Sequence, residues 1–135
     1  NTPRDALSRM EALISMGASS LPTLTVRAMI ASSIDIVVQT SRLRDGTRRI
    51  THISEVIGLA GDVITTQDLL TFQSDYDPVT QKLSGHFQSS GIARPNFWNR
   101  AVYFGMADRL TAALEEAGAP QYRPEQKAVP QERSA

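Results

Sequence analysis

The sequence contains no cysteine, which excludes a disulfide framework and any metal site built from thiolates. It also lacks an excess of charge of either sign, because 14 Lys and Arg residues are balanced by 14 Asp and Glu residues. Proteins that coat DNA or RNA through phosphate contacts carry a basic surplus, so the balance disfavours that class. No apolar run is long enough to cross a bilayer and no signal peptide is visible at the start, so we expect a cytoplasmic protein.

The residues that bind and hydrolyse a nucleotide are also missing. A phosphate-binding loop ends in Gly-Lys-Ser/Thr, because backbone N–H groups cradle the phosphates and the lysine meets their charge. Neither lysine of this chain, Lys82 or Lys127, follows a glycine. His52 and His86 have no second ligand at metal-binding spacing, and we interpret both as structural or solvated. The sequence therefore predicts no catalytic residue and no metal site, and we expect this chain alone to be inactive.

Helical signals open the sequence. Thr2 suits an N-cap, Pro3 suits the first helical position, and Asp5 is placed to complete a capping box. Apolar residues at helical spacing then predict a helix over residues 3–16, followed by a second helix over residues 21–33. The residues of the first helix that we expect to face the core are Leu7, Leu13 and Ile14.

The middle of the chain is predicted to form strands. Residues 34–40 are β-branched and short, as in a buried strand, and Asp45-Gly46 is a hairpin signal. Residues 49–56 alternate between the two sides of a strand, and one side must carry a mixture of apolar and polar residues. We therefore expect both sides of this strand to be partly covered. Further strands are expected over residues 62–73, where residues 67–70 could instead form a short helical turn, and over residues 82–88. A loop is expected over 74–78, and Gly58 and Gly61 are expected to bracket a turn.

The end of the chain returns to helix, with elements expected over residues 96–104 and 106–117 and Gly118 as the C-cap. These elements predict an α/β domain over residues 1–118. Residues 119–135 contain three prolines and few large apolar groups, and they predict a disordered tail.

Four arginines surround the predicted hairpin turn, at Arg42, Arg44, Arg48 and Arg49. Two interpretations remain open. The turn could be simply solvated, or it could be a surface for phosphate, a neighbouring subunit or an acidic partner, since arginine is suited to bidentate recognition of anions.

Several motifs in series resemble one family. The run NTPRDALSRME (residues 1–11) is similar to the segment after the histidine of the His motif in type II/IV secretion ATPases. The runs IDIVVQ and SRLRDG within residues 34–46, and ISEVIG, GDVIT and QD within residues 53–68, resemble the same family. GIARP (residues 91–95) and YFG (residues 103–105) resemble its Tad/Cpa pilus-assembly subgroup. The resemblance covers residues 1 to about 118 in order.

The resemblance implies the C-terminal half of a RecA-like P-loop NTPase domain, with an antiparallel strand extension and C-terminal helices. It implies a homo-hexameric motor, peripheral to the inner membrane, that couples ATP hydrolysis to pilus assembly or protein export. ATP and Mg²⁺ would be cofactors of the full-length protein, and inner-membrane platform proteins its partners. The P-loop and the arginine fingers would lie before Asn1, and only Asn1 and Thr2 would approach the nucleotide, as the tail of the His motif. The arginine turn inherits no role and stays a possible subunit or partner contact.

The sequence has two alternative interpretations from other classes of function. A stand-alone, non-catalytic interaction module of α/β fold is the alternative, and a Gly-Lys-Ser/Thr motif on the order of a hundred residues upstream would distinguish it from the motor. A nucleic-acid adaptor that uses the arginine turn is disfavoured by the zero net charge and by the lack of a basic stripe with stacking aromatics.

Overall fold

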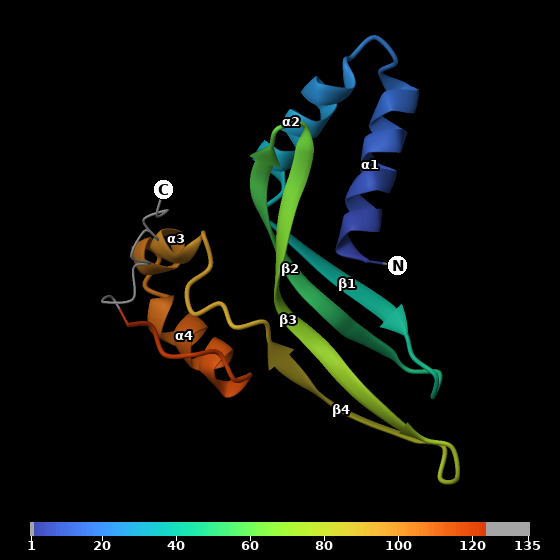
Figure 1. The fold of residues 1–135 in the computed structure, drawn as a ribbon, viewed down its shortest axis with the longest axis vertical. Helices are drawn as coiled ribbons and strands as arrows, with labels where there is room; N and C mark the ends of the chain where they lie inside the picture. The colour runs from blue at the N-terminus through green and yellow to red at the C-terminus, as the bar shows by residue number, and fades with distance from the viewer. Residues whose placement is uncertain (1, 124–135) are drawn as a thin grey trace, which may run out of the picture.

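The computed structural model describes residues 2–123 (Figure 1). In chain order the elements are α1 (Pro3–Gly17), α2 (Thr23–Ser33), β1 (Ile36–Arg42), β2 (Arg48–Ala60), β3 (Val63–Asp77), β4 (Lys82–Ser89), α3 (Trp98–Tyr103) and α4 (Ala107–Glu116). The strands form one antiparallel sheet in the order β1-β2-β3-β4. The fold is therefore mixed α/β, as the sequence predicts. Asn1 and residues 124–135, on which part of the predictions falls, lie outside the described residues.

The sheet is long, and its two ends differ (Figure 1). Helices α1 and α2 lie beside the half that holds the β2–β3 turn, and α3 and α4 lie near the C-terminal end of β4. The β1–β2 turn and the β3–β4 turn project together from the other end of the sheet, away from the helices. We call this projecting end, residues 42–49 with residues 76–83, the distal end.

Helix α1 begins as its sequence predicts. The Thr2 hydroxyl accepts a hydrogen bond from the Asp5 N–H at 3.2 Å, and the Asp5 carboxylate accepts one from the Thr2 N–H at 2.9 Å. The side of α1 that is buried is narrower than predicted. Leu7 is buried and Ile14 is half-buried, but Leu13 is 69% exposed, so its predicted place in the core is wrong.

The main core lies between α1, α2 and the sheet. Its buried residues are Leu7, Val26, Ile30 and Val56. Partly buried apolar side chains surround them, from Ile14, Ile34, Val37 and Ile64. Three consecutive residues of β2, from Ser54 to Val56, are buried, which confirms the expectation that both sides of this strand are covered.

Strand β3 includes residues 74–77, so the loop predicted over residues 74–78 is wrong for these four residues. It continues to Asp77, which pairs with Lys82 of β4. Phe72 lies opposite Phe87, with ring centres 5.4 Å apart in an edge-to-face arrangement. Such cross-strand pairs stabilise a ladder beyond the propensity of its residues. Gly58 lies within β2 at a register shift, with a φ of 148°, and the turn forms at Gly61 and Asp62.

Residues 119–123 follow α4 and contact both the end of this helix and Arg94. Ala119 is buried, and its N–H donates to the Leu114 carbonyl at 2.9 Å. The Arg94 guanidinium carbon lies 3.5 Å from the centre of the Tyr122 ring.

We predict that the hydrogen bond from the Asp5 N–H to the Thr2 hydroxyl contributes measurably to the stability of the protein. Thr2→Ala removes the side-chain acceptor for the Asp5 N–H and is expected to lower the free energy of unfolding by about 1 kcal/mol. Urea denaturation of the variant and the parent protein measures the difference. A Thr2→Ser variant keeps the acceptor and serves as the control, and it should stay close to the parent.

The same cap predicts an acid dependence of stability. Hydrogen bonds from the Thr2 N–H, and then from the Thr2 hydroxyl, lower the pKa of Asp5 in the folded protein. The stabilisation by Asp5 is therefore complete above its unfolded pKa and is lost as the pH falls through its folded pKa. An Asp5→Asn variant should lose less stability than the parent over that acidic range. Equal pH slopes in thermal denaturation would contradict this prediction.

Candidate functional site

The four arginines of the β1–β2 turn lie together at the distal end, as the hairpin predicts. Arg42 donates to the Gly46 carbonyl at 3.2 Å, and Arg49 donates to the Thr47 hydroxyl at 3.4 Å. Thr47 also donates to Asp45 through its hydroxyl and its N–H, and these bonds, the hydroxyl first, lower the pKa of Asp45. The turn is therefore ordered by its own polar groups.

Two of these arginines also contact aromatic rings of β3. The guanidinium carbon of Arg44 lies 4.5 Å from the centre of the Tyr76 ring, and that of Arg49 lies 5.7 Å from the centre of the Phe72 ring. Cation–π contacts of this kind hold a guanidinium in place while its N–H groups stay available for an anion. Sequence could not predict these contacts, because they join residues of different strands and because residues 74–78, which include Tyr76, are predicted to form a loop.

Arg48 is the least constrained member of the cluster. It lies directly opposite Arg42 in the ladder, which places two like charges side by side. Within residues 2–123 none of the four arginines forms an ion pair, and the Arg48 side chain has neither a hydrogen bond nor an aromatic contact. The turn therefore presents unneutralised positive charge to its surroundings.

A polar pocket lies where α1 begins. Thr2, Pro3 and Arg4 line it from the helix, and a cavity of about 370 Å³ separates them from side chains of the sheet. The sheet residues of this pocket are His52, Thr66 and Asp68. Thr2, which the resemblance implies to be near a nucleotide, is thus close to a histidine that we interpreted as structural or solvated. Its predicted companion Asn1 lies outside the described part of the chain.

Hydrogen bonds hold the sheet side of this polar pocket in place. His52 Nδ1 lies 3.1 Å from the Thr51 hydroxyl, and the Ser54 hydroxyl donates to Asp68. The Thr2 hydroxyl is itself engaged in the helix cap. This pocket has the polar groups to contact a ligand, but no P-loop is present to hold a phosphate.

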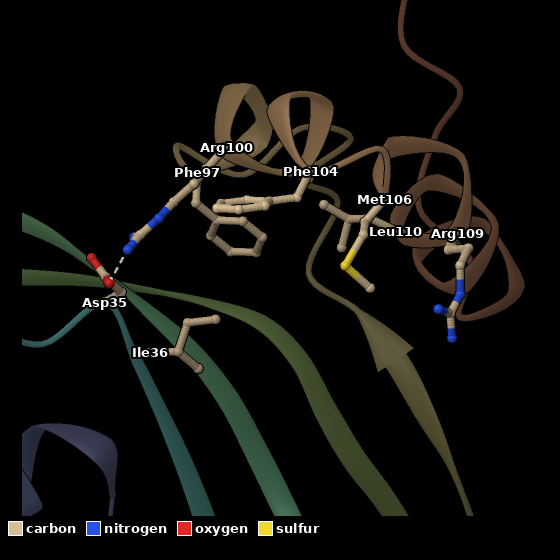
Figure 2. A pocket seen from close by; sticks show the side chains of 9 residues that line it. Asp35, Ile36, Phe97, Arg100, Phe104, Met106, Arg109 and Leu110 are labelled. Atoms are coloured by element: carbon tan, nitrogen blue, oxygen red, sulfur yellow. Dashed lines mark hydrogen bonds and ion pairs between the residues drawn. The ribbon is translucent and has the colours of Figure 1, made fainter.

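A cavity of about 500 Å³ lies between α3, α4 and the start of β1 (Figure 2). We call it the apolar groove. Its lining residues are Asp35, Ile36, Phe97, Arg100, Ala101, Phe104, Met106, Arg109 and Leu110. In Figure 2 the rings of Phe97 and Phe104 lie on one side of the cavity and Ile36 on the other. Arg100 closes one end through an ion pair with Asp35 at 2.8 Å.

A buried carboxylate connects the wall of the apolar groove to the sheet. Glu55 of β2 is 2% exposed, and its two oxygens accept hydrogen bonds from the Phe97 N–H at 3.0 Å and from Gln67 Nε2 at 2.8 Å. The Ser89 N–H also donates to the Ala117 carbonyl at 2.7 Å, which links the end of β4 to the end of α4. These bonds position α3 and α4. Sequence spacing could not reveal the groove, because its walls come from residues about sixty positions apart.

No family model matches the chain, and no curated protein matches it. Within residues 2–123 the structure shows no group of three or more His, Asp or Glu residues that could hold a metal ion. In the same residues, no helix has both the length and the apolar character that a membrane span requires.

Proposed function

We propose that this chain is the C-terminal part of a hexameric ATPase that drives pilus assembly or protein export, of the type II/IV secretion family and its Tad/Cpa subgroup. The serial motifs of residues 1–118 support the proposal. Two structural observations add support: the free edge of β1 and an exposed apolar side of α1, both of which the rest of a larger α/β domain would cover.

The strand edge belongs to β1. Within residues 2–123 β1 pairs only with β2, so its outer edge carries backbone groups that no other described strand pairs with. Ile36 and Val38 on this strand are 41% and 51% exposed. The strand contains neither proline nor lysine, the residues that commonly protect a free edge against pairing. Such an edge is suited to a further strand.

The helix side belongs to α1. Met10, Leu13 and Met16 are all exposed, and Leu13 and Met16 are 69% and 82% exposed. A stripe of large apolar side chains on one helix indicates a surface that another part of a protein covers. In the proposed full-length motor, the half of the RecA-like domain that carries the P-loop would cover both surfaces.

The roles then divide between the two halves. ATP and Mg²⁺ would be bound by the half that carries the P-loop, in the cytoplasm at the inner membrane. Thr2 and the polar pocket beside it would lie near the nucleotide. The arginine turn, with its unneutralised charge, would contact a neighbouring subunit of the homo-hexamer or an inner-membrane platform protein.

We predict opposite results for two polypeptides in an ATPase assay. The 135-residue chain should neither turn over magnesium-ATP nor bind it at micromolar concentration in calorimetry, because it has no phosphate-binding loop. The product of the whole reading frame should hydrolyse magnesium-ATP. Turnover by the 135-residue chain, or none by the product of the whole reading frame, would contradict the proposal.

A stand-alone interaction module is the second candidate, and the apolar groove favours it. A cavity of about 500 Å³ with several aromatic and aliphatic side chains is a common form of binding site. A reading frame without a nucleotide-binding motif, together with an inactive product, would select this function over the motor.

A further inference from the structure

The charges of the chain are unevenly placed along the sheet. The distal end, residues 42–49 with residues 76–83, carries five basic side chains and two acidic ones, a surplus of three positive charges. Because the whole chain has a net charge of zero, all other residues together carry a surplus of three negative charges. The end of the sheet that projects away from the helices is therefore the positive end of the molecule (Figure 1). Its basic residues are Arg42, Arg44, Arg48, Arg49 and Lys82, and its acidic residues are Asp45 and Asp77.

The two aspartates of the distal end do not cancel this surplus. Asp45 accepts hydrogen bonds from the N–H and the hydroxyl of Thr47, and Asp77 accepts them from the Val79 N–H and the Thr80 hydroxyl. Both carboxylates thus order the turns in which they lie, and within residues 2–123 neither forms an ion pair with an arginine. Adding Asp75, which directly precedes residues 76–83, still leaves two positive charges in excess. The distal end therefore attracts anions.

The second turn of the distal end carries an exposed apolar side chain. We call residues 77–81 the β3–β4 tip. Its Val79 is 90% exposed, the highest value among the large apolar side chains of the described residues. The guanidinium carbon of Arg44, in the β1–β2 turn, lies 4.5 Å from the centre of the Tyr76 ring, just before the tip. The basic turn and the apolar tip are therefore presented side by side.

This combination fits a lipid surface better than a protein. The centre of a protein interface is apolar and poor in charged residues, whereas the distal end is rich in charge and carries Val79 on a narrow turn. At an anionic bilayer, basic side chains meet the headgroup phosphates and apolar side chains enter the layer beneath them. Arginine binds phosphate through two parallel N–H groups, and aromatic contacts already hold the guanidinium groups of Arg44 and Arg49 in place. The helices lie away from this end, so a flat surface can reach both turns (Figure 1).

We propose that the distal end docks on an anionic phospholipid surface, with the arginine turn on the headgroup phosphates and Val79 between the headgroups. The attraction acts over about 8–10 Å at physiological ionic strength, so the contact is reversible and sensitive to salt. The inference extends the proposed function from protein partners of the arginine turn to the lipid itself. It stands on the residues of the distal end alone and requires no ATPase activity.

Sedimentation with vesicles tests the role of the charge. The 135-residue chain should bind vesicles of equal parts phosphatidylglycerol and phosphatidylcholine at low salt, and should not bind vesicles of phosphatidylcholine alone. Arg48→Glu should weaken this binding about fivefold or more, since each basic residue near an anionic surface contributes about that factor. Arg9→Glu changes the net charge by the same amount at an exposed site on α1 and should leave the binding nearly unchanged. Equal weakening by the two variants would overturn the proposal, because net charge and not the distal end would then drive the binding.

A probe on the tip tests the insertion of Val79. Because the chain has no native cysteine, a Val79→Cys variant can be labelled at one site with an environment-sensitive fluorophore. The control is a labelled Met16→Cys variant, since Met16 on α1 is 82% exposed and lies outside the distal end. Docking predicts a blue shift of the emission at position 79 when the phosphatidylglycerol vesicles are added, and no shift at position 16. Equal shifts at both positions, or a shift at position 16 alone, would refute the proposed orientation.

An acidic polypeptide distinguishes lipid from an acidic protein as the partner. Poly-glutamate carries the same sign of charge as the vesicles but has no lipid layer. If the chain binds poly-glutamate while the probe at position 79 does not respond to the vesicles, the distal end is a site for an acidic protein and the proposal is wrong. No nucleotide is present in these assays, so failure to bind lipid leaves the proposed ATPase to its own test.

Discussion

Leu7→Ala is expected to lower the free energy of unfolding by about 2–5 kcal/mol. Leu7 is 3% exposed and packs in the cluster that joins α1 and α2 to the sheet, with Val26, Ile30 and Val56. Replacing its isobutyl group by a methyl group leaves a cavity that the neighbours on α2 and β2 cannot readily fill. Domains of this size are stable by only about 5–15 kcal/mol, so the loss is a large part of the total. Urea denaturation followed by far-UV circular dichroism measures it.

The matched control lies on the same helix. Leu13→Ala makes the same chemical change at a side chain that is 69% exposed, and we expect a change within about 0.5 kcal/mol. Similar losses for the two variants would mean that α1 does not pack through the Leu7 side, and the described core would be wrong. If the product of the whole reading frame is the proposed motor, Leu13→Ala should destabilise it more than it destabilises this chain.

The comparison of Leu7 with Leu13 also shows what the sequence could predict about α1. Thr2, Pro3 and Asp5 act within one turn of helix, so local sequence predicted how the helix begins. The helical period predicted an apolar side, but the neighbours decide how much of it is covered. The described structure covers Leu7 and part of Ile14 and leaves Leu13 exposed.

For the strands too, local sequence predicted the elements, but contacts with other elements decide where they end. The loop predicted over residues 74–78 is wrong for residues 74–77, which continue β3. The strand continues because Phe72 meets Phe87 and Tyr76 pairs with Leu83 across the ladder, and these partners are not visible from β3 alone. The arginine cluster was predicted because its members are neighbours in sequence. Its contacts with Tyr76 and Phe72, and the groove between β1 and α3, depend on tertiary structure.

Glu55→Ala is the second substitution for which we expect a large loss of stability. The Glu55 side chain is buried, and it accepts hydrogen bonds from a backbone donor of the segment before α3 and from a side chain of β3. Glu55→Ala leaves the Phe97 N–H and the Gln67 amide without their acceptor in a partly buried place. An unsatisfied buried donor costs about 1–3 kcal/mol, so we expect a loss of at least that size. Thermal and urea denaturation measure the total loss.

The region of the protein that is destabilised distinguishes a Glu55 variant from a variant of a core residue such as Leu7. Few other bonds hold α3 against the sheet, and the Arg100–Asp35 pair is about 60% exposed on both sides, where an ion pair contributes little. Glu55→Ala should therefore increase amide hydrogen exchange first at Phe97 and in α3, while the amides of α1 and α2 stay protected. Glu55→Gln keeps an oxygen that can accept from the Phe97 N–H and should lose less stability. Unchanged exchange at Phe97 in the alanine variant would show that the carboxylate does not hold α3. If α3 is held this way, Glu55→Ala should also widen the apolar groove, since Phe97 forms one wall of the cavity.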